Sequence, residues 1–184
     1  MALISAQYGA DVALGQVFIG STAAAGVSMP LYSSTTQVFC LWNPAGSGKN
    51  AYLLNCAIGF VSGTATVSNV VYAYSTGMGS AIGTAAPMVT FTKVSPVNAY
   101  LGSTNQSAMF FAPATVTTTS APTFLKSMGV SIATFTPTAT VTPMFTIFDN
   151  INGSLALSPG TTLFVAGNVA NAVVADISLM WEEV

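Results

Sequence analysis

The fold class of this chain is indicated by one segment near its end, VVADISLMWE, which occupies residues 173–182. Every second side chain of this segment is apolar, namely those of Val173, Ala175, Ile177, Leu179 and Trp181. The intervening positions include Asp, Ser and Glu. A period of two is typical of a β-strand that packs one face against a core. The segment therefore predicts a strand whose core face carries the five apolar residues.

The residues upstream of this strand predict a partner for it. Ser158-Pro159-Gly160 has the composition of a turn, and a second strand is expected over residues 161–166. Residues 167–171 then separate the two strands. We expect them to form an antiparallel hairpin.

A second hairpin is predicted between residues 37–42 and 51–61, joined by the loop at 43–50. The first strand is apolar on both faces and therefore must be covered on both, and one side of the second is lined by Tyr52, Leu54, Cys56, Ile58 and Phe60. A second sheet with a long connection, or a neighbouring subunit, could provide the cover. We expect this hairpin to lie in the central sheet.

The rest of the chain shows short strand-like runs separated by Gly and Pro, and no sustained helical period. Further strands are expected at residues 66–74, 89–93, 107–111, 129–135 and 143–149, with a turn at Asn152-Gly153. This pattern predicts an all-β fold, a single-domain antiparallel β-sandwich of the jelly-roll type spanning residues 1–184. Residues 1–30 are expected to be either an extended N-terminal arm or a first strand.

Charged side chains are scarce: Lys+Arg number 3, Asp+Glu number 5, and histidine is absent. Acid–base, phosphate and metal chemistry all need such groups, so we expect no enzyme, no catalytic residues, no cofactor and no metal. The net charge of -2 and the lack of a basic cluster argue against direct nucleic-acid binding. A surface with so little charge favours association with copies or partners.

The hydrophobic fraction is 52% and the mean hydropathy +0.66, values that raise the question of a membrane protein. Polar residues interrupt even the longest uncharged stretch, at 50–92, so no transmembrane helix is expected. The first 20 residues lack the basic region of a secretory signal. We therefore expect synthesis in the cytoplasm and no membrane partner.

Gly46-Ser47-Gly48-Lys49 resembles part of a phosphate-binding loop. Asn43 stands where the first glycine of that motif belongs, and Asn50 replaces the hydroxyl residue that would bind magnesium. The composition favours a tight hairpin loop in which Lys49 is solvated.

Cys40 and Cys56 are equidistant from Gly48, so a symmetric hairpin would place them opposite each other. In that register the two side chains could come close enough to form a disulfide, but a cytoplasmic origin favours free thiols. We expect a buried, inert pair, since two thiols without histidine make neither a zinc site nor an activated nucleophile.

Asp149, Asn150 and Asn152 could together offer oxygen ligands to calcium. Ile151 occupies a position where the calcium loop needs a ligand, so turn formation is the favoured interpretation.

The remaining acids do not form a pair suited to catalysis. Glu182 and Glu183 are adjacent on the predicted last strand and point to opposite faces, so we expect them to place charge on a sheet edge. Asp11 and Asp176 are isolated in the sequence and are expected to be exposed.

Three segments resemble small virion structural proteins of tailed bacteriophages, in particular head decoration proteins. They are the 43–50 loop with the strand that follows it, the Ser158-Pro159-Gly160-Thr161 turn with its strand, and the terminal Leu179-Met180-Trp181-Glu182-Glu183. The resemblance covers about a third of the chain. It implies β-sandwich or jelly-roll subunits, often trimeric, that bind the major capsid protein or other virion proteins and have no catalytic residues.

The function expected from the sequence is therefore that of a capsid decoration protein in the virion. It would form a homo-oligomer, with a trimer favoured, through uncharged interfaces. The alternative is a tail or fibre module that recognises surface glycans. Such a module would need solvent-facing Trp or Tyr residues near loops. Trp42 and Trp181 could in principle contribute to an aromatic platform, but the apolar pattern of their strands favours a core role.

Overall fold

The computed structural model describes residues 8–64, 67–76, 88–91, 94–113, 116–132 and 146–184, and in them the chain is almost entirely β-structure. The elements are α1 (Gly9–Ala13), β1 (Val17–Ser21), β2 (Val27–Ser28), β3 (Thr36–Gln37), β4 (Cys40–Asn43), β5 (Ala51–Thr64), β6 (Ser68–Ser75), β7 (Met88–Phe91), β8 (Val97–Asn98), β9 (Phe110–Ala112), β10 (Val116–Thr118), β11 (Thr123–Ile132), β12 (Thr146–Asn150), β13 (Ala156–Leu157), β14 (Thr161–Gly167) and β15 (Ala172–Glu183).

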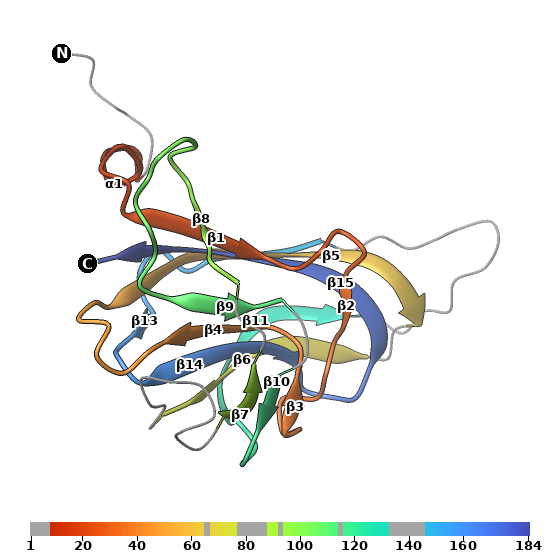
Figure 1. Cartoon of the computed structure of the whole chain (residues 1–184). Helices are drawn as coiled ribbons and strands as arrows, with labels where there is room; N and C mark the ends of the chain where they lie inside the picture. The colour runs from red at the N-terminus through yellow and green to blue at the C-terminus, as the bar shows by residue number, and fades with distance from the viewer. Residues whose placement is uncertain (1–7, 65–66, 77–87, 92–93, 114–115, 133–145) are drawn as a thin grey trace.

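These strands form three antiparallel sheets, which we name A, B and C. Sheet A has the order β12-β5-β15-β1-β8, with β13 also paired to β5 and β2 to β15. Sheet B has the order β11-β6-β14-β4-β9, and sheet C the order β3-β10-β7. Sheets A and B face each other across the main core, as Figure 1 shows.

The chain crosses repeatedly between sheets A and B. β1, β5, β12 and β15 lie in sheet A, whereas β4, β6, β11 and β14 lie in sheet B. Eight strands shared between two facing sheets in this manner are the arrangement of a jelly roll. The predicted all-β, jelly-roll-like sandwich is therefore confirmed.

The main core follows from the alternation in the last strand. Val173, Ala175, Ile177, Leu179 and Trp181 are all buried, as predicted for its core face. The Trp181 ring stacks on Phe18 of β1, with ring centroids 6.4 Å apart. β15 lies between β5 and β1 and is thus a central strand of sheet A.

A second, smaller core lies on the outer face of sheet B. It contains Cys40 and Trp42 of β4, Phe164 of β14, and Val116 of β10 in sheet C. The long connection from β6 to β11 supplies β7 and β10, which with β3 make up sheet C, and Val116 of β10 packs against the outer face of β4. The expectation that β4 is covered on both faces is confirmed, with the cover coming from a long connection within the chain.

Both predicted hairpins are wrong. β4 and β5 lie in different sheets, and so do β14 and β15. The 44–50 loop and the 168–171 turn cross from one sheet to the other, a distance of about 10 Å that a few residues can span. A loop of this length fits a hairpin and an inter-sheet connection equally well, and the composition does not distinguish them.

All connections of the jelly roll fall at one of two ends. The 44–50 loop, the end of β6, the start of β11, the β12–β14 connection, α1 and the last residue lie at one end, which we call the near end (Figure 1). Residues 8–30 include α1, β1 and β2. β1 pairs with β15 and is the first strand of sheet A in chain order, so the expectation of a first strand is confirmed for this part of residues 1–30. Residues 1–7 lie outside the described residues, as do parts of the strands expected at 66–74, 89–93, 129–135 and 143–149.

Among the described residues, no helix has both the length and the apolar character needed to cross a membrane.

Candidate functional site: an apolar pocket between the sheets

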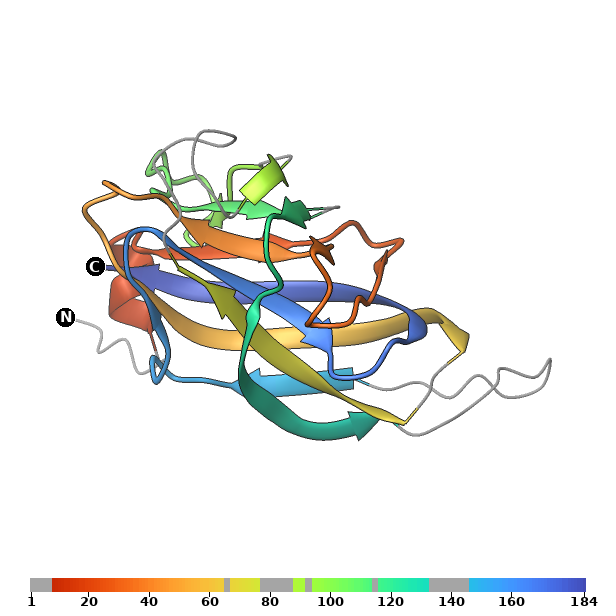
Figure 2. The same ribbon diagram turned by 90° about the horizontal axis from the view of Figure 1, so that it is seen from below.

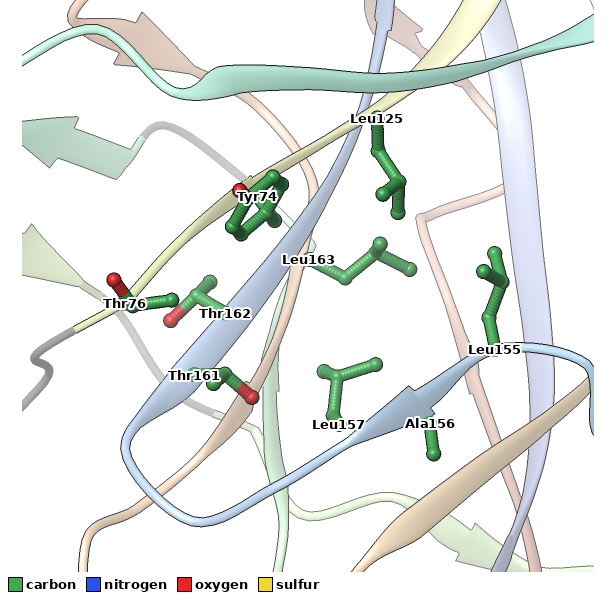
Figure 3. Close-up of a pocket in the computed structure, with 9 residues that line it drawn as sticks. All are labelled: Tyr74, Thr76, Leu125, Leu155, Ala156, Leu157, Thr161, Thr162 and Leu163. Atoms are coloured by element: carbon green, nitrogen blue, oxygen red, sulfur yellow. The ribbon is translucent and has the colours of Figure 1, made fainter.

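A pocket of about 260 Å³ opens at the near end, between sheets A and B. Its lining is almost entirely apolar and comes from β6, β11, β13 and β14. The lining residues are Tyr74, Thr76, Leu125, Leu155, Ala156, Leu157, Thr161, Thr162 and Leu163 (Figure 3).

Four leucines from the two sheets define the space. Leu163 of β14 and Leu157 of β13 are buried members of the main core, and Leu155 packs against that core. Figure 3 shows their side chains and that of Leu125 facing one common space. The pocket is therefore the open end of the main core, where the two sheets do not fully close on each other.

Leu125 reaches the pocket because β11 carries a bulge. The register between β11 and β6 shifts between Phe124 and Lys126, so Leu125 is the extra residue. A bulge bends a strand and redirects one side chain. Leu125 is 38% exposed and forms the rim of the pocket.

A polar cluster lies where β11 and β12 run along the same edge of the sandwich (Figure 2). Lys126 Nζ lies 3.4 Å from Asp149 Oδ2, which joins the two sheets, and 5.8 Å from the ring centre of Tyr72. The two ionic side chains are 40% and 16% exposed. An ion pair of this exposure contributes at most about 1 kcal/mol.

The cluster also contains a buried thiol, that of Cys56. Burial raises the pKa of Cys56 to about 12, and burial likewise raises the pKa of Tyr72. Both groups therefore stay protonated at neutral pH, so Cys56 is a thiol and Tyr72 a phenol in the folded protein. The contacts of the cluster join the sheet edges.

The two cysteines are free and buried, but they do not face each other. Cys40 belongs to the outer core of sheet B and Cys56 to the main core, so the opposed pair expected from a hairpin is wrong. Burial raises the pKa of Cys40 as well. The expectation of buried, free thiols is confirmed.

We expect neither thiol to react with a disulfide reagent such as DTNB while the protein is folded. Thiolates are the reactive species, and both groups are buried and protonated at pH 7–8. The same assay in urea should release two equivalents. Rapid reaction of one equivalent in native buffer would show that a cysteine is more accessible than the structure places it.

The glycine-rich loop does not form a phosphate site. Gly46 and Gly48 have positive φ values of 86° and 72°, as the turn requires, and Lys49 is exposed as expected. β5 follows the loop, so no helix N-terminus directs amide groups at a ligand. Ser47 Oγ instead donates to Asn43 Oδ1 at 2.6 Å.

The proposed calcium ligands do not converge. Asp149 faces Lys126, whereas Asn150 is exposed and Asn152 accepts a hydrogen bond from Tyr8. Asn152 and Gly153 both have positive φ, which confirms the predicted turn. Among the described residues, no three Asp, Glu, Cys or His side chains come close enough together to bind a metal ion.

Glu183 is not a surface charge on a sheet edge, and that expectation is wrong. It is 1% exposed and accepts hydrogen bonds from Ser107 Oγ, from Ala108 N at 2.9 Å and from Trp181 Nε1 at 3.1 Å. These bonds fix the loop before β9 to the last strand. The signal was present in the sequence, because the alternation that buries Trp181 also places residue 183 on the core face.

The other acids are dispersed. Asp176 is exposed as expected, whereas Asp11 is half-buried beside Glu182. Partial burial, together with the charge of Asp11, raises the pKa of Glu182. The two carboxylates lie on the outer side of sheet A, away from the pocket.

The aromatic platform expected of a glycan-binding module does not involve either tryptophan. Trp42 is 3% exposed and Trp181 is fully buried. Both belong to hydrophobic cores. The core role favoured for both tryptophans is therefore confirmed, and among the described residues Tyr100, at 55% exposure, is a solvent-facing tyrosine.

Comparisons with known proteins found no matching family model, no matching curated protein and no matching solved structure.

Proposed function

We propose that this protein is a non-enzymatic structural subunit of a bacteriophage virion, a capsid decoration protein that acts through uncharged contacts. The observation that carries the proposal is the character of its surface. Twelve large apolar side chains are exposed in the described part of the chain, whereas the charged residues classed as exposed there are Lys49 and Asp176. Such a surface favours association over isolation in solution.

Several of the exposed apolar residues are prominent. Leu101 is 79% exposed, Leu14 64% and Phe148 61%. Leu14 and Leu101 lie in neighbouring segments, since Asn105 Nδ2 donates to the carbonyl oxygen of Leu14 at 3.2 Å. Burial of apolar area contributes roughly 25 cal/mol per Å², so an interface of ordinary size can offset the loss of freedom on association without ion pairs.

The fold is consistent with this role. Jelly rolls build many viral capsid domains, although the fold also serves lectins and enzymes and is only an analogy here. The titratable groups of the described residues are dispersed or already bonded, as shown above for Lys126, Asp149 and Glu183. We therefore propose that the protein acts by binding its neighbours, namely other copies of itself and the major capsid protein.

We expect the protein to form a homo-oligomer, with three copies favoured, that persists from low salt to 1 M NaCl. Apolar contacts are not screened by salt, whereas contacts between exposed charges are. Light scattering after gel filtration at several salt concentrations would measure the mass. Dissociation at high salt, or a monomer at every protein concentration, would contradict the proposal.

Attachment to the particle provides the second test. Purified phage heads that lack this protein should bind it to saturation, and cryo-electron microscopy should show it on the outer shell at both salt extremes. Density on the tail alone would contradict the assignment to the head.

A further inference from the structure

A second pocket, of about 280 Å³, opens at the near end of the sandwich and shares no lining residue with the apolar pocket. We call it the polar pocket, because most of its lining residues carry polar side chains. Its walls come from the residues that follow α1, the end of the 44–50 loop, the connection between β8 and β9, and the end of β15 (Figure 1). Four segments that are far apart in the sequence therefore meet around one space.

Hydrogen bonds fix the walls of the polar pocket to one another. Asn105 Nδ2 donates to the carbonyl oxygen of Leu14 at 3.2 Å, and Glu183 N donates to the carbonyl oxygen of Gln16 at 2.9 Å. Gly15 has a φ of 69°, and a Cβ atom there would lie 2.5 Å from Asn105 Nδ2, so glycine permits this close approach. The shape of the pocket is thus set by the fold itself.

The carboxylate of Glu183, although 1% exposed, lines the pocket and keeps capacity for one more hydrogen bond. A carboxylate has about four acceptor positions. Three of them accept hydrogen bonds, from Ser107 Oγ, Ala108 N and Trp181 Nε1. Oε2 accepts only the bond from Ala108 N, at 2.9 Å. A ligand donor in the pocket could fill the remaining position.

Other side chains of the lining have hydrogen-bonding groups that no described residue uses. Asn105 and Gln106 donate through their amide nitrogens to backbone carbonyl oxygens, so both amide oxygens remain available as acceptors. The Lys49 ammonium group and the Gln16 amide make no hydrogen bond or ion pair with a described residue. The polar pocket therefore combines available acceptors with available donors.

This combination favours a ligand that carries several hydroxyl groups. A hydroxyl group both donates and accepts, so it can accept from Lys49 Nζ and donate to Glu183 Oε2 or to an amide oxygen. An anion would face the Glu183 carboxylate, and a cation would face Lys49. Because the charges of these two side chains offset each other, an uncharged ligand fits the pocket best.

Size and apolar contacts narrow the class of ligand further. The volume of about 280 Å³ lies just below the range of roughly 300–1,000 Å³ that is usual for pockets of drug-sized ligands, so it suits one small ring. The exposed Leu14 and the buried Phe18 add apolar surface to the lining. A sugar ring presents hydroxyl groups together with a C–H face that packs on apolar side chains.

We propose that the polar pocket binds one unit of an uncharged saccharide, with Lys49 as a donor and Glu183 as an acceptor. Asn105 and Gln106 supply further acceptors. This inference goes beyond the proposed function and does not depend on it, since a structural subunit can lack a saccharide site and a saccharide-binding protein need not be part of a virion. Each can therefore fail without the other.

The first experiment measures the binding of single sugars to the whole isotope-labelled chain by NMR. The probes are the methyl glycosides of glucose, galactose and mannose, and N-acetylglucosamine, each titrated to the upper millimolar range. We expect at least one of them to shift the indole N–H signal of Trp181, which is bonded to Glu183, and the backbone amide signals of residues 14–16 and 105–108. The indole signal of Trp42, in the outer core of sheet B, should stay in place. If none of the four sugars moves the pocket signals, the proposal is overturned.

Acetate and ethylammonium are the charged probes in the same titration, at constant ionic strength. We expect neither to move the signals of the pocket residues as far as the best sugar does. A response to either ion that equals or exceeds the response to every sugar would mean that the pocket takes a charged group. That result would overturn the saccharide assignment.

The second experiment compares two lysine variants. Lys49→Ala removes a donor from the pocket and should weaken binding of the responding sugar about tenfold, a usual effect of losing a hydrogen bond to a charged group. Lys126→Ala is the matched control, because it removes the same charge from a residue outside the pocket, and should leave the affinity unchanged. Both side chains are exposed enough for the variants to fold. Equal affinities of the two variants would overturn the role of Lys49 and with it the proposed site.

Discussion

Replacing Trp181 by alanine is expected to remove roughly 3–5 kcal/mol of unfolding free energy, the usual cost of deleting a large buried aromatic side chain. Trp181 is fully buried in the central strand of sheet A, stacks on Phe18 and donates to Glu183. Few changes in this chain would remove as many contacts. Urea unfolding followed by circular dichroism would measure the loss.

Met180→Ala is the matched control for this prediction. Met180 is the neighbour of Trp181 on the same strand but points to the outer face of sheet A, where it is half-buried. We expect a loss near 1 kcal/mol or less there. Similar losses for both variants would mean that the last strand is not oriented as described.

Replacing Glu183 by alanine is expected to destabilise the protein by about 3 kcal/mol. The change leaves the donors of Ser107, Ala108 and Trp181 without their carboxylate acceptor, and an unsatisfied buried donor costs about 1–3 kcal/mol. Hydrogen exchange should also increase at the amides of residues 107–109, because the loop before β9 loses its attachment to β15.

Glu182→Ala is the control, since it removes the same functional group one residue away, from the outer face of the sheet. Glu182 is half-buried and its pKa is raised by partial burial and by Asp11, so its charge is not stabilised in the folded state. We expect unchanged or slightly increased stability at pH 7. A loss equal to that of Glu183→Ala would contradict the assignment of the bonds to residue 183.

Individual strands could be predicted from the sequence because burial on one face leaves a period of two. The alternation at residues 173–181 identified the core face of β15 correctly, and the turns at Pro159-Gly160 and Asn152-Gly153 were found from their composition. The double-faced apolar pattern of β4 correctly indicated cover on both sides.

Strand pairing could not be predicted in the same way. A strand at the end of a short loop can pair with its predecessor or cross to the facing sheet, and both solutions bury the same side chains. The placement of Cys40 and Cys56 in separate cores follows from that choice. The residues around a short loop do not determine which of the two pairings forms.

The apolar pocket was missed for a related reason. Leu155, Leu157 and Leu163 have the same sequence pattern as any other core residue, and only the relative position of the sheets leaves a space between them. The bulge that redirects Leu125 is likewise a matter of register between β11 and β6. Neither the pocket nor the bulge is marked by a distinctive residue composition, so neither could be predicted from the sequence.

The alternating path of the chain also has a practical consequence for protein engineering. Val184 exchanges backbone hydrogen bonds with Asn50, so a domain fused after it would project from the near end, alongside α1. The 168–171 turn lies at the opposite end, and peptides grafted there would point the other way. One subunit could thus carry two kinds of cargo, displayed in opposite directions and separated by the length of the sandwich.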